Sequence, residues 1–166
     1  MITMTGSNNK IIDTTGILLK KDAFVVIVKT EWNAHVTDIL EEGCITVLKE
    51  NNIGYRVLQV PGAFEIPFAI QNFHANLGSV IPDAYIALGC VIRGETPHFE
   101  FISKGLTQGL MQLNLTLSVP VIFGVLTVND QMQADERTGG RQGHKGKEAA
   151  ATAIKMIGLS QSFTSN

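Results

Sequence analysis

Four short apolar runs alternate with longer amphipathic stretches along this chain, and this alternation restricts the possible folds more than any other feature. The apolar runs lie at 24–30, 55–60, 84–92 and 119–127. Stretches with apolar residues at helical spacing follow them, at 33–52, 64–77, 97–116 and 130–158, the last interrupted at 138–143. The first run, FVVIVKT, is β-branched and almost unbroken, as is typical of a strand buried on both faces. Four βα units of this length predict an α/β fold with one parallel sheet between two layers of helices.

The composition fits a single domain of this kind. The chain has 166 residues, about one domain's length, and 45% of them are apolar, which excludes a disordered chain. We expect one domain over 11–166, preceded by a flexible segment over 1–10. No apolar run approaches the roughly 20 residues of a membrane-spanning helix. Thirteen basic residues against fifteen acidic ones leave no basic tract for nucleic acid. We therefore expect neither a membrane nor a nucleic acid as partner.

Two further features bear on location and assembly. Cys44 and Cys90 have no metal-ligand or redox spacing, and no signal peptide is recognisable, so we expect a cytoplasmic protein without a metal site. The charged fraction of 17% is well below the roughly 25% typical of soluble domains. Other subunits are therefore expected to cover part of the surface. We also expect an extended segment at 11–20 that adds an edge strand to a neighbouring subunit's sheet.

The site is expected where the apolar runs end, because ligands bind beyond the carboxyl ends of the strands in open parallel sheets. The segments that follow the runs are EWN at 31–33, PGAFE at 61–65, RGETPH at 93–98 and LTVND at 126–130. Trp32, the only tryptophan, either covers the end of the core or offers a flat surface to a heteroaromatic ring. Asn33 is a plausible N-cap of the following helix. Glu65 either only favours a helix start or accepts hydrogen bonds from a polyol or an amine.

The segment at 93–98 carries the strongest local signal. Gly94 frees the backbone, Thr96 is placed to cap a helix, and Pro97 suits the first helical position. Free N–H groups at such a helix start form an anion site that suits phosphate. His98 lies in the same turn, where a histidine is either structural or transfers protons near neutral pH. We favour proton transfer.

A glycine-rich cationic segment, ERTGGRQGHKGK, follows at 136–147. As structure alone, it predicts a flexible, solvated helix kink. As a functional segment, it offers Arg137 for a forked contact to phosphate and Lys145 as a second point charge. By themselves these residues indicate phosphate or another small anion. His35 and His74 have no comparable setting and are expected to be surface or packing residues.

Taken in order, these segments resemble the 6,7-dimethyl-8-ribityllumazine synthase family of riboflavin biosynthesis. The matching motifs are VPGAFEIP at 60–67, LGCVIRGETPH at 88–98, PVIFGVLT at 120–127, QADER at 133–137 and KG at 145–146. Five ordered motifs, over about 24–157, are far more specific than any one of them. The resemblance implies a flavodoxin-like three-layer αβα sandwich with a four-stranded parallel sheet.

The resemblance also implies a reaction and an assembly. Enzymes of this family condense 5-amino-6-(D-ribitylamino)uracil with 3,4-dihydroxy-2-butanone 4-phosphate to 6,7-dimethyl-8-ribityllumazine, phosphate and water. The amine forms an imine with the ketone, phosphate is eliminated and the ring closes, with no cofactor. The family forms pentamers, decamers or hollow sixty-subunit particles, and riboflavin synthase is a further implied partner. For this chain we expect a ring of five and, above it, the particle rather than the decamer.

By position in the motifs, the resemblance gives each site residue a role. His98 would be the proton donor. The ribitylaminopyrimidine would be bound by Trp32, Ala63, Phe64, Glu65, Cys90, Val91 and Ile92, with Phe123 covering it from a neighbouring subunit. The butanone phosphate would be bound by Glu95 and Thr96 through their backbone, by Arg137 and by Lys145. Trp32, Cys90 and His144 stand where phenylalanine, threonine and asparagine are more usual, and none of these replacements removes a group that the chemistry needs.

Two other functions stay open from the residues alone. A flavodoxin-like protein that binds a flavin or lumazine without turnover would use Trp32 as its platform. Passive ring binding needs neither His98 nor Arg137, so their presence argues against it. A mainly structural shell subunit would account for the low charged fraction, and this role is compatible with the enzyme.

Overall fold

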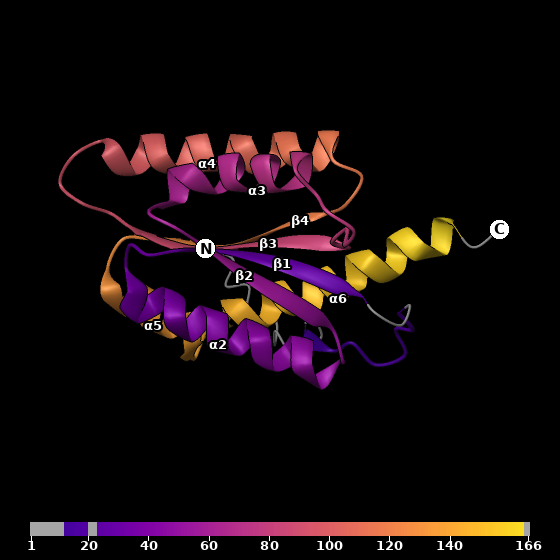
Figure 1. The fold of residues 1–166 in the computed structure, drawn as a ribbon. Helices are drawn as coiled ribbons and strands as arrows, with labels where there is room; N and C mark the ends of the chain where they lie inside the picture. The colour runs from indigo at the N-terminus through magenta and orange to yellow at the C-terminus, as the bar shows by residue number, and fades with distance from the viewer. Residues whose placement is uncertain (1–11, 20–22, 165–166) are drawn as a thin grey trace.

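The structure is a computed structural model that describes residues 12–19 and 23–164 (Figure 1), so the flexible segment expected at 1–10 lies outside it. One parallel sheet is formed by β1 (Phe24–Thr30), β2 (Gly54–Val60), β3 (Ala84–Ile92) and β4 (Val121–Val128). Their order is β2-β1-β3-β4, so β1 and β3 are central. The last strand begins two residues later than predicted, because Pro120 has no N–H to donate to the sheet. The predicted parallel sheet is confirmed.

Helices cover both faces of the sheet (Figure 1). On one face lie α3 (Ile66–Ala75) and α4 (His98–Thr116), and on the other lie α2 (Ala34–Glu50), α5 (Gln131–Glu136) and α6 (Lys145–Phe163). A short 3-10 turn, η1 (Ala63–Glu65), precedes α3. This is the predicted flavodoxin-like three-layer arrangement. Within the described ranges, no helix has both the length and the apolar content to span a membrane.

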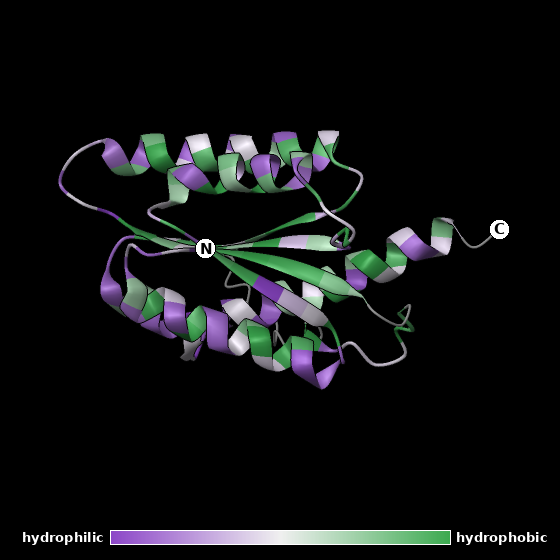
Figure 2. Ribbon diagram, in the orientation of Figure 1, coloured by the Kyte–Doolittle hydropathy of each residue, from purple (hydrophilic) through white to green (hydrophobic). Residues whose placement is uncertain are grey.

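The two faces of the sheet pack into two separate hydrophobic cores. Val25 and Ile27 of β1 belong to the core shared with α2 and α6, and Val26 and Val28 belong to the core shared with α3 and α4. All four side chains are fully buried, as expected of a central strand between two helical layers. Figure 2 shows strongly apolar central strands between helices that alternate apolar and polar residues.

The region after β4 differs from the single interrupted helix predicted over 130–158. Two helices, α5 and α6, are separated by a small antiparallel ribbon of β5 (Thr138–Gly140) and β6 (Gly143–His144). Gly139 and Gly143 have positive φ values of 120° and 87°, which lets the chain reverse within a few residues. The expected flexible kink is therefore a hydrogen-bonded ribbon.

The start of α6 is held closely against α2. A Cβ atom on Gly146 would overlap the carbonyl oxygen of Leu40, and one on Gly43 would overlap the imidazole of His144. His144 also caps α6, since its Nδ1 accepts the N–H of Lys147 at 3.4 Å. The two glycines allow this approach, which fixes the first turn of α6 relative to the sheet.

The segment predicted to be extended at 11–20 is described only over 12–19. There the chain turns at Thr15 and Gly16, with a φ of 80° at the glycine, and forms no strand within the described chain. Ile17 and Leu19 pack against the core under α2 and α6. The turn was not predicted, and it uses the freedom of glycine to adopt positive φ. Addition of a strand to a neighbouring sheet stays a prediction.

Candidate active site

The loops at the carboxyl ends of the strands are joined by backbone hydrogen bonds. The Trp32 N–H donates to the carbonyl oxygen of Pro61 at 3.1 Å, which links the loops after β1 and β2. The Arg93 N–H donates to the carbonyl oxygen of Val128 at 2.8 Å, which links the loops after β3 and β4. All four segments predicted to carry the site therefore meet at one edge of the sheet.

Asn33 bridges two of these loops and is not the side-chain cap predicted for α2. It occupies the N-cap position, but its backbone is left-handed (φ 59°, ψ 43°) and its side chain makes no capping bond. The side chain instead donates to the carbonyl oxygen of Cys90 at 2.9 Å. Asparagine adopts this backbone conformation more readily than most residues. It thereby ties the loop of Trp32 to the end of β3.

A cavity of about 590 Å³ opens between these loops and the start of α4. It brings together most of the residues predicted for the site, namely Trp32, Ala63, Phe64, Glu65, Cys90, Val91, Ile92, Thr96 and His98. The lining is completed by Thr30, Asn33, Pro61, Gly62, Gly94, Phe99 and Ile102. It is mostly apolar with a few polar groups, which is the usual character of a site for a small organic molecule.

The Trp32 ring lies in the cavity wall and does not cover the core. The residue is 74% exposed, and Phe64, which follows β2, is 60% exposed. A ring that covered the end of the core would be buried. Of the two interpretations of Trp32, the structure therefore favours a surface on which a planar ligand can stack.

Cys90 contributes a neutral thiol to the cavity. The residue is buried at the end of β3, and burial raises the pKa of its thiol to about 11. The thiol therefore stays protonated at neutral pH and is a poor nucleophile. Covalent catalysis by this cysteine is not supported.

The loop before α4 has unengaged backbone donors. Across the described residues, the N–H groups of Glu95 and Thr96 donate to no protein acceptor. Thr96 is not the predicted cap, because α4 begins at His98 after Pro97 and no side chain caps it. The donors at this helix start are therefore available to an anion. The Glu95 side chain is exposed and does not line the cavity.

Arg93 braces the same loop. Its guanidinium donates to Glu100 Oε1 at 2.7 Å and to Asn129 Oδ1 at 3.0 Å, and its central carbon lies 4.3 Å from the centroid of the Phe99 ring. These contacts join the loop to α4 and to the loop after β4. His98, exposed at the first position of α4, is thus presented to the cavity from a restrained backbone.

Arg137, Lys145 and Phe123 lie away from this cavity. Arg137 and Lys145 line a second hollow of about 490 Å³ beside β4, which shares no lining residue with the first. Phe123, half-buried on β4, lines neither hollow and packs against the core of α3 and α4. Within one chain, the structure therefore does not bring these three residues together with His98.

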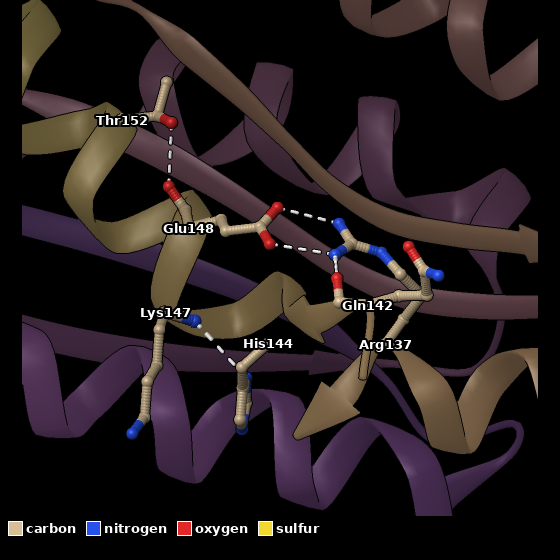
Figure 3. A network of polar contacts seen from close by, with 6 residues as sticks. All are labelled: Arg137, Gln142, His144, Lys147, Glu148 and Thr152. Carbon is tan, nitrogen blue, oxygen red and sulfur yellow. Dashed lines mark hydrogen bonds and ion pairs between the residues drawn. The ribbon is translucent and has the colours of Figure 1, made fainter. Parts of the chain in front are cut away.

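A two-pronged ion pair holds Arg137 in the second hollow (Figure 3). Its Nη1 and Nη2 donate to Glu148 Oε1 and Oε2 at 2.8 and 2.7 Å, and Nη1 also donates to the carbonyl oxygen of Gln142. Burial acts to raise the pKa of the Glu148 carboxyl, but hydrogen bonds and charge from Arg137 outweigh burial and lower this pKa. Burial lowers the pKa of the nearby Lys145 ammonium. Arg137 is thus paired with an ionised carboxylate.

Comparison with known proteins matches nearly all of the described chain. A family model described as 6,7-dimethyl-8-ribityllumazine synthase matches residues 22–161. The chain belongs to this family. Curated 6,7-dimethyl-8-ribityllumazine synthases include those of Porphyromonas gingivalis (49% identical; 84% of this chain, 86% of the relative), Bacteroides fragilis (47%; 79% and 92%) and Christiangramia forsetii (40%; 93% and 92%). The resemblance found in the five motifs is confirmed.

Three residues of the two hollows and their surroundings were not predicted for this lumazine synthase family member. Glu148 carries no sign of its role in the sequence, where it is one acidic residue among the first residues of a helix. Phe99 and Ile102 line the cavity beside His98 from one face of α4, and their spacing by about one helical turn was an available signal. In the described ranges, no three His, Cys, Asp or Glu side chains are grouped to hold a metal.

Proposed function

We propose that this chain forms 6,7-dimethyl-8-ribityllumazine from 5-amino-6-(D-ribitylamino)uracil and 3,4-dihydroxy-2-butanone 4-phosphate. The observation that carries the proposal is the cavity at the carboxyl edge of the sheet, lined by Trp32, His98 and the loop of Thr96. An aromatic platform, an imidazole and an anion site suit the joining of a flat amine to a phosphorylated ketone. The family membership of the chain supports the same reaction.

The pyrimidine is proposed to stack on Trp32 within the apolar part of the cavity. Phe64 and Ile92 offer further apolar surface in the lining, and Glu65 offers an acceptor for the hydroxyl groups of the ribityl chain. The walls at Ala63, Cys90 and Val91 add packing and backbone groups. Holding two reactants in one orientation accelerates their condensation without a cofactor. The reactants then lose their translational and rotational entropy on binding and not in the transition state.

Phosphate elimination is proposed to take place at the start of α4. The free N–H groups of Glu95 and Thr96 are suited to bind the phosphate and to stabilise the charge that develops as it leaves. His98, two residues after Thr96, is the candidate to transfer protons during imine formation and elimination. An exposed imidazole can exchange its proton with solvent between turnovers.

A neighbouring subunit is proposed to complete the cavity with Phe123, Arg137 and Lys145. Support comes from the separation of the two hollows on one chain, since Thr96 lines the first, Arg137 lines the second, and the two share no lining residue. Trp32 and Phe64 leave an apolar rim that a neighbour would cover. The proposed enzyme is thus a homo-oligomer whose site lies between two copies, and the cytoplasm stays its expected location.

The direct experiment mixes the purified protein with both substrates. Lumazine absorbance should rise together with equimolar inorganic phosphate, and omission of either substrate should abolish both signals. Binding of the pyrimidine without product formation would instead indicate a lumazine- or flavin-binding protein without turnover. That result would refute the proposed function.

A further inference from the structure

The end of the Arg137 side chain is fixed by two neighbours (Figure 3). Glu148, in the first turn of α6, contacts it end-on through both carboxylate oxygens, at 2.8 and 2.7 Å. The carbonyl oxygen of Gln142, between β5 and β6, accepts a further bond from Nη1. A two-pronged contact to a carboxylate fixes both the position and the plane of a guanidinium.

One edge of this guanidinium is left for a ligand. An arginine has about five N–H donors, and three of those of Arg137 are engaged by Glu148 and Gln142. The Nε–H and the second Nη2–H have no acceptor among the residues that the structure describes. These two N–H groups point outward from the same edge of the planar group, so they can make a second forked contact to two oxygens of a phosphate.

Glu148 is itself held in place by its surroundings. The residue is only 6% exposed, and the start of α6 is packed against α2 where Gly146 meets Leu40. The backbone carbonyl oxygen of Glu148 accepts a hydrogen bond from the Thr152 hydroxyl at 2.7 Å. A buried anchor with little freedom can orient Arg137 in a way that a mobile surface carboxylate cannot.

Charge and orientation predict opposite effects of Glu148 on phosphate binding. As a charge, it partly cancels the attraction of Arg137 for an anion and repels the phosphate directly. As an anchor, it fixes the orientation of Arg137, which lines the hollow, and so reduces the entropy lost when phosphate binds. The end-on geometry and the burial of the pair favour orientation.

We propose that Glu148 is a positioning residue, which holds Arg137 end-on so that its Nε and Nη2 edge is presented to the phosphate of the butanone phosphate. This inference rests on the proposed function, because it assumes that the chain uses this substrate. It assigns Glu148 a role through Arg137 and no contact with the substrate.

The test is a double-mutant cycle between positions 137 and 148, measured as the KM for each substrate and as kcat/KM for the butanone phosphate. Glu148→Gln keeps the shape of the side chain but replaces one acceptor oxygen with an amide. We expect the KM for the butanone phosphate to rise about tenfold and the KM for the pyrimidine to stay unchanged. In an Arg137→Ala background, Glu148→Gln should have no further effect on kcat/KM, because no guanidinium remains to be positioned. Additive effects, or a lower KM in Glu148→Gln, would overturn the proposal.

Two further variants keep the test decisive. Glu41→Gln is the matched control, because Glu41 also pairs with a buried cation, Lys29 at 2.6 Å, but lines neither hollow, and both KM values should be unchanged.

Glu148→Asp serves if Glu148→Gln fails to fold, since it keeps the charge but is too short to contact both Nη atoms. A raised KM in Glu148→Asp supports orientation, and a wild-type KM refutes it. Failure of the wild-type protein to make lumazine would refute the proposed function, whereas wild-type turnover with an unaffected Glu148→Gln would refute only the role of Glu148.

Discussion

At the scale of single residues, Trp32 offers a direct test of how the cavity is occupied. Its ring is 74% exposed in the cavity wall, and it is the only tryptophan of the chain. Stacking of a pyrimidine on an indole changes its environment, so 5-amino-6-(D-ribitylamino)uracil should quench the tryptophan fluorescence in a saturable titration. Trp32→Phe should lose the signal and keep most of the activity, because phenylalanine still provides a platform. Unchanged fluorescence with a ligand that calorimetry shows to bind would place Trp32 outside the site.

His98 should affect the rate and leave the fold intact. It is exposed at the start of α4 and lines the cavity, so its removal takes away a proton-transfer group without opening the core. We expect His98→Ala to reduce kcat about 10²–10⁴-fold, the usual range for loss of a general acid or base. Slow elimination of phosphate should remain. His35→Ala is the control, because His35 is also exposed at a helix start but lines neither hollow. An unchanged kcat in His98→Ala would exclude proton transfer by His98.

At the scale of helices and strands, the close approach of α6 to α2 holds the first turn of α6, which carries Lys145 of the second hollow. A Cβ atom on Gly146 would overlap the backbone of Leu40, so Gly146→Ala must push the two helices apart. Overpacking of this kind costs about 1–3 kcal/mol or more, and each kcal/mol lowers the melting temperature by roughly 2–4 °C in a chain of this size. Gly78→Ala is the control, since a Cβ there would meet nothing within 4 Å. Thermal unfolding followed by circular dichroism measures the difference, and equal melting temperatures would contradict the close approach.

The helices and strands also show which features could be predicted from the sequence and which could not. Strand β1 was predicted within its observed bounds, because a β-branched apolar run of this length has few other stable environments. The ribbon between α5 and α6 was missed, since its strands are two and three residues long and its glycines were interpreted as a helix kink. The cavity residues follow strand ends and were therefore predictable from topology. The pairing of Arg137 with Glu148 depends on the ribbon of β5 and β6, which returns the chain so that the Lys145 N–H donates to the Arg137 carbonyl oxygen, and no local pattern encodes this return.

At the scale of the whole molecule, several large aromatic side chains of the single chain are exposed. Phe68, Phe101 and Phe163 are more than two thirds exposed, at 72%, 71% and 74%, on three different helices. The low charged fraction of 17% points the same way, toward a surface that other subunits partly cover. We expect a ring of five as the smallest active unit and a sixty-subunit particle above it. Sedimentation of dilute protein through a density gradient, with activity measured in each fraction, tests both the ring and the particle. An active monomer would contradict the ring, and a species near ten subunits would contradict the particle.

The separation of the two hollows on one chain also makes the protein suited to complementation between copies that are impaired at different residues. Subunits that carry His98→Ala keep a sound Arg137, and subunits that carry Arg137→Ala keep a sound His98. Refolded together in equal amounts, they should pair at random, and about a quarter of the sites should then combine both sound halves. Each variant alone should have no such site and only residual activity, so activity should rise on mixing and reach about a quarter of the wild-type value. A mixture no more active than its parts would mean that each chain works by itself. In a cell with two differently damaged copies of the gene, the same arithmetic would restore growth without added riboflavin.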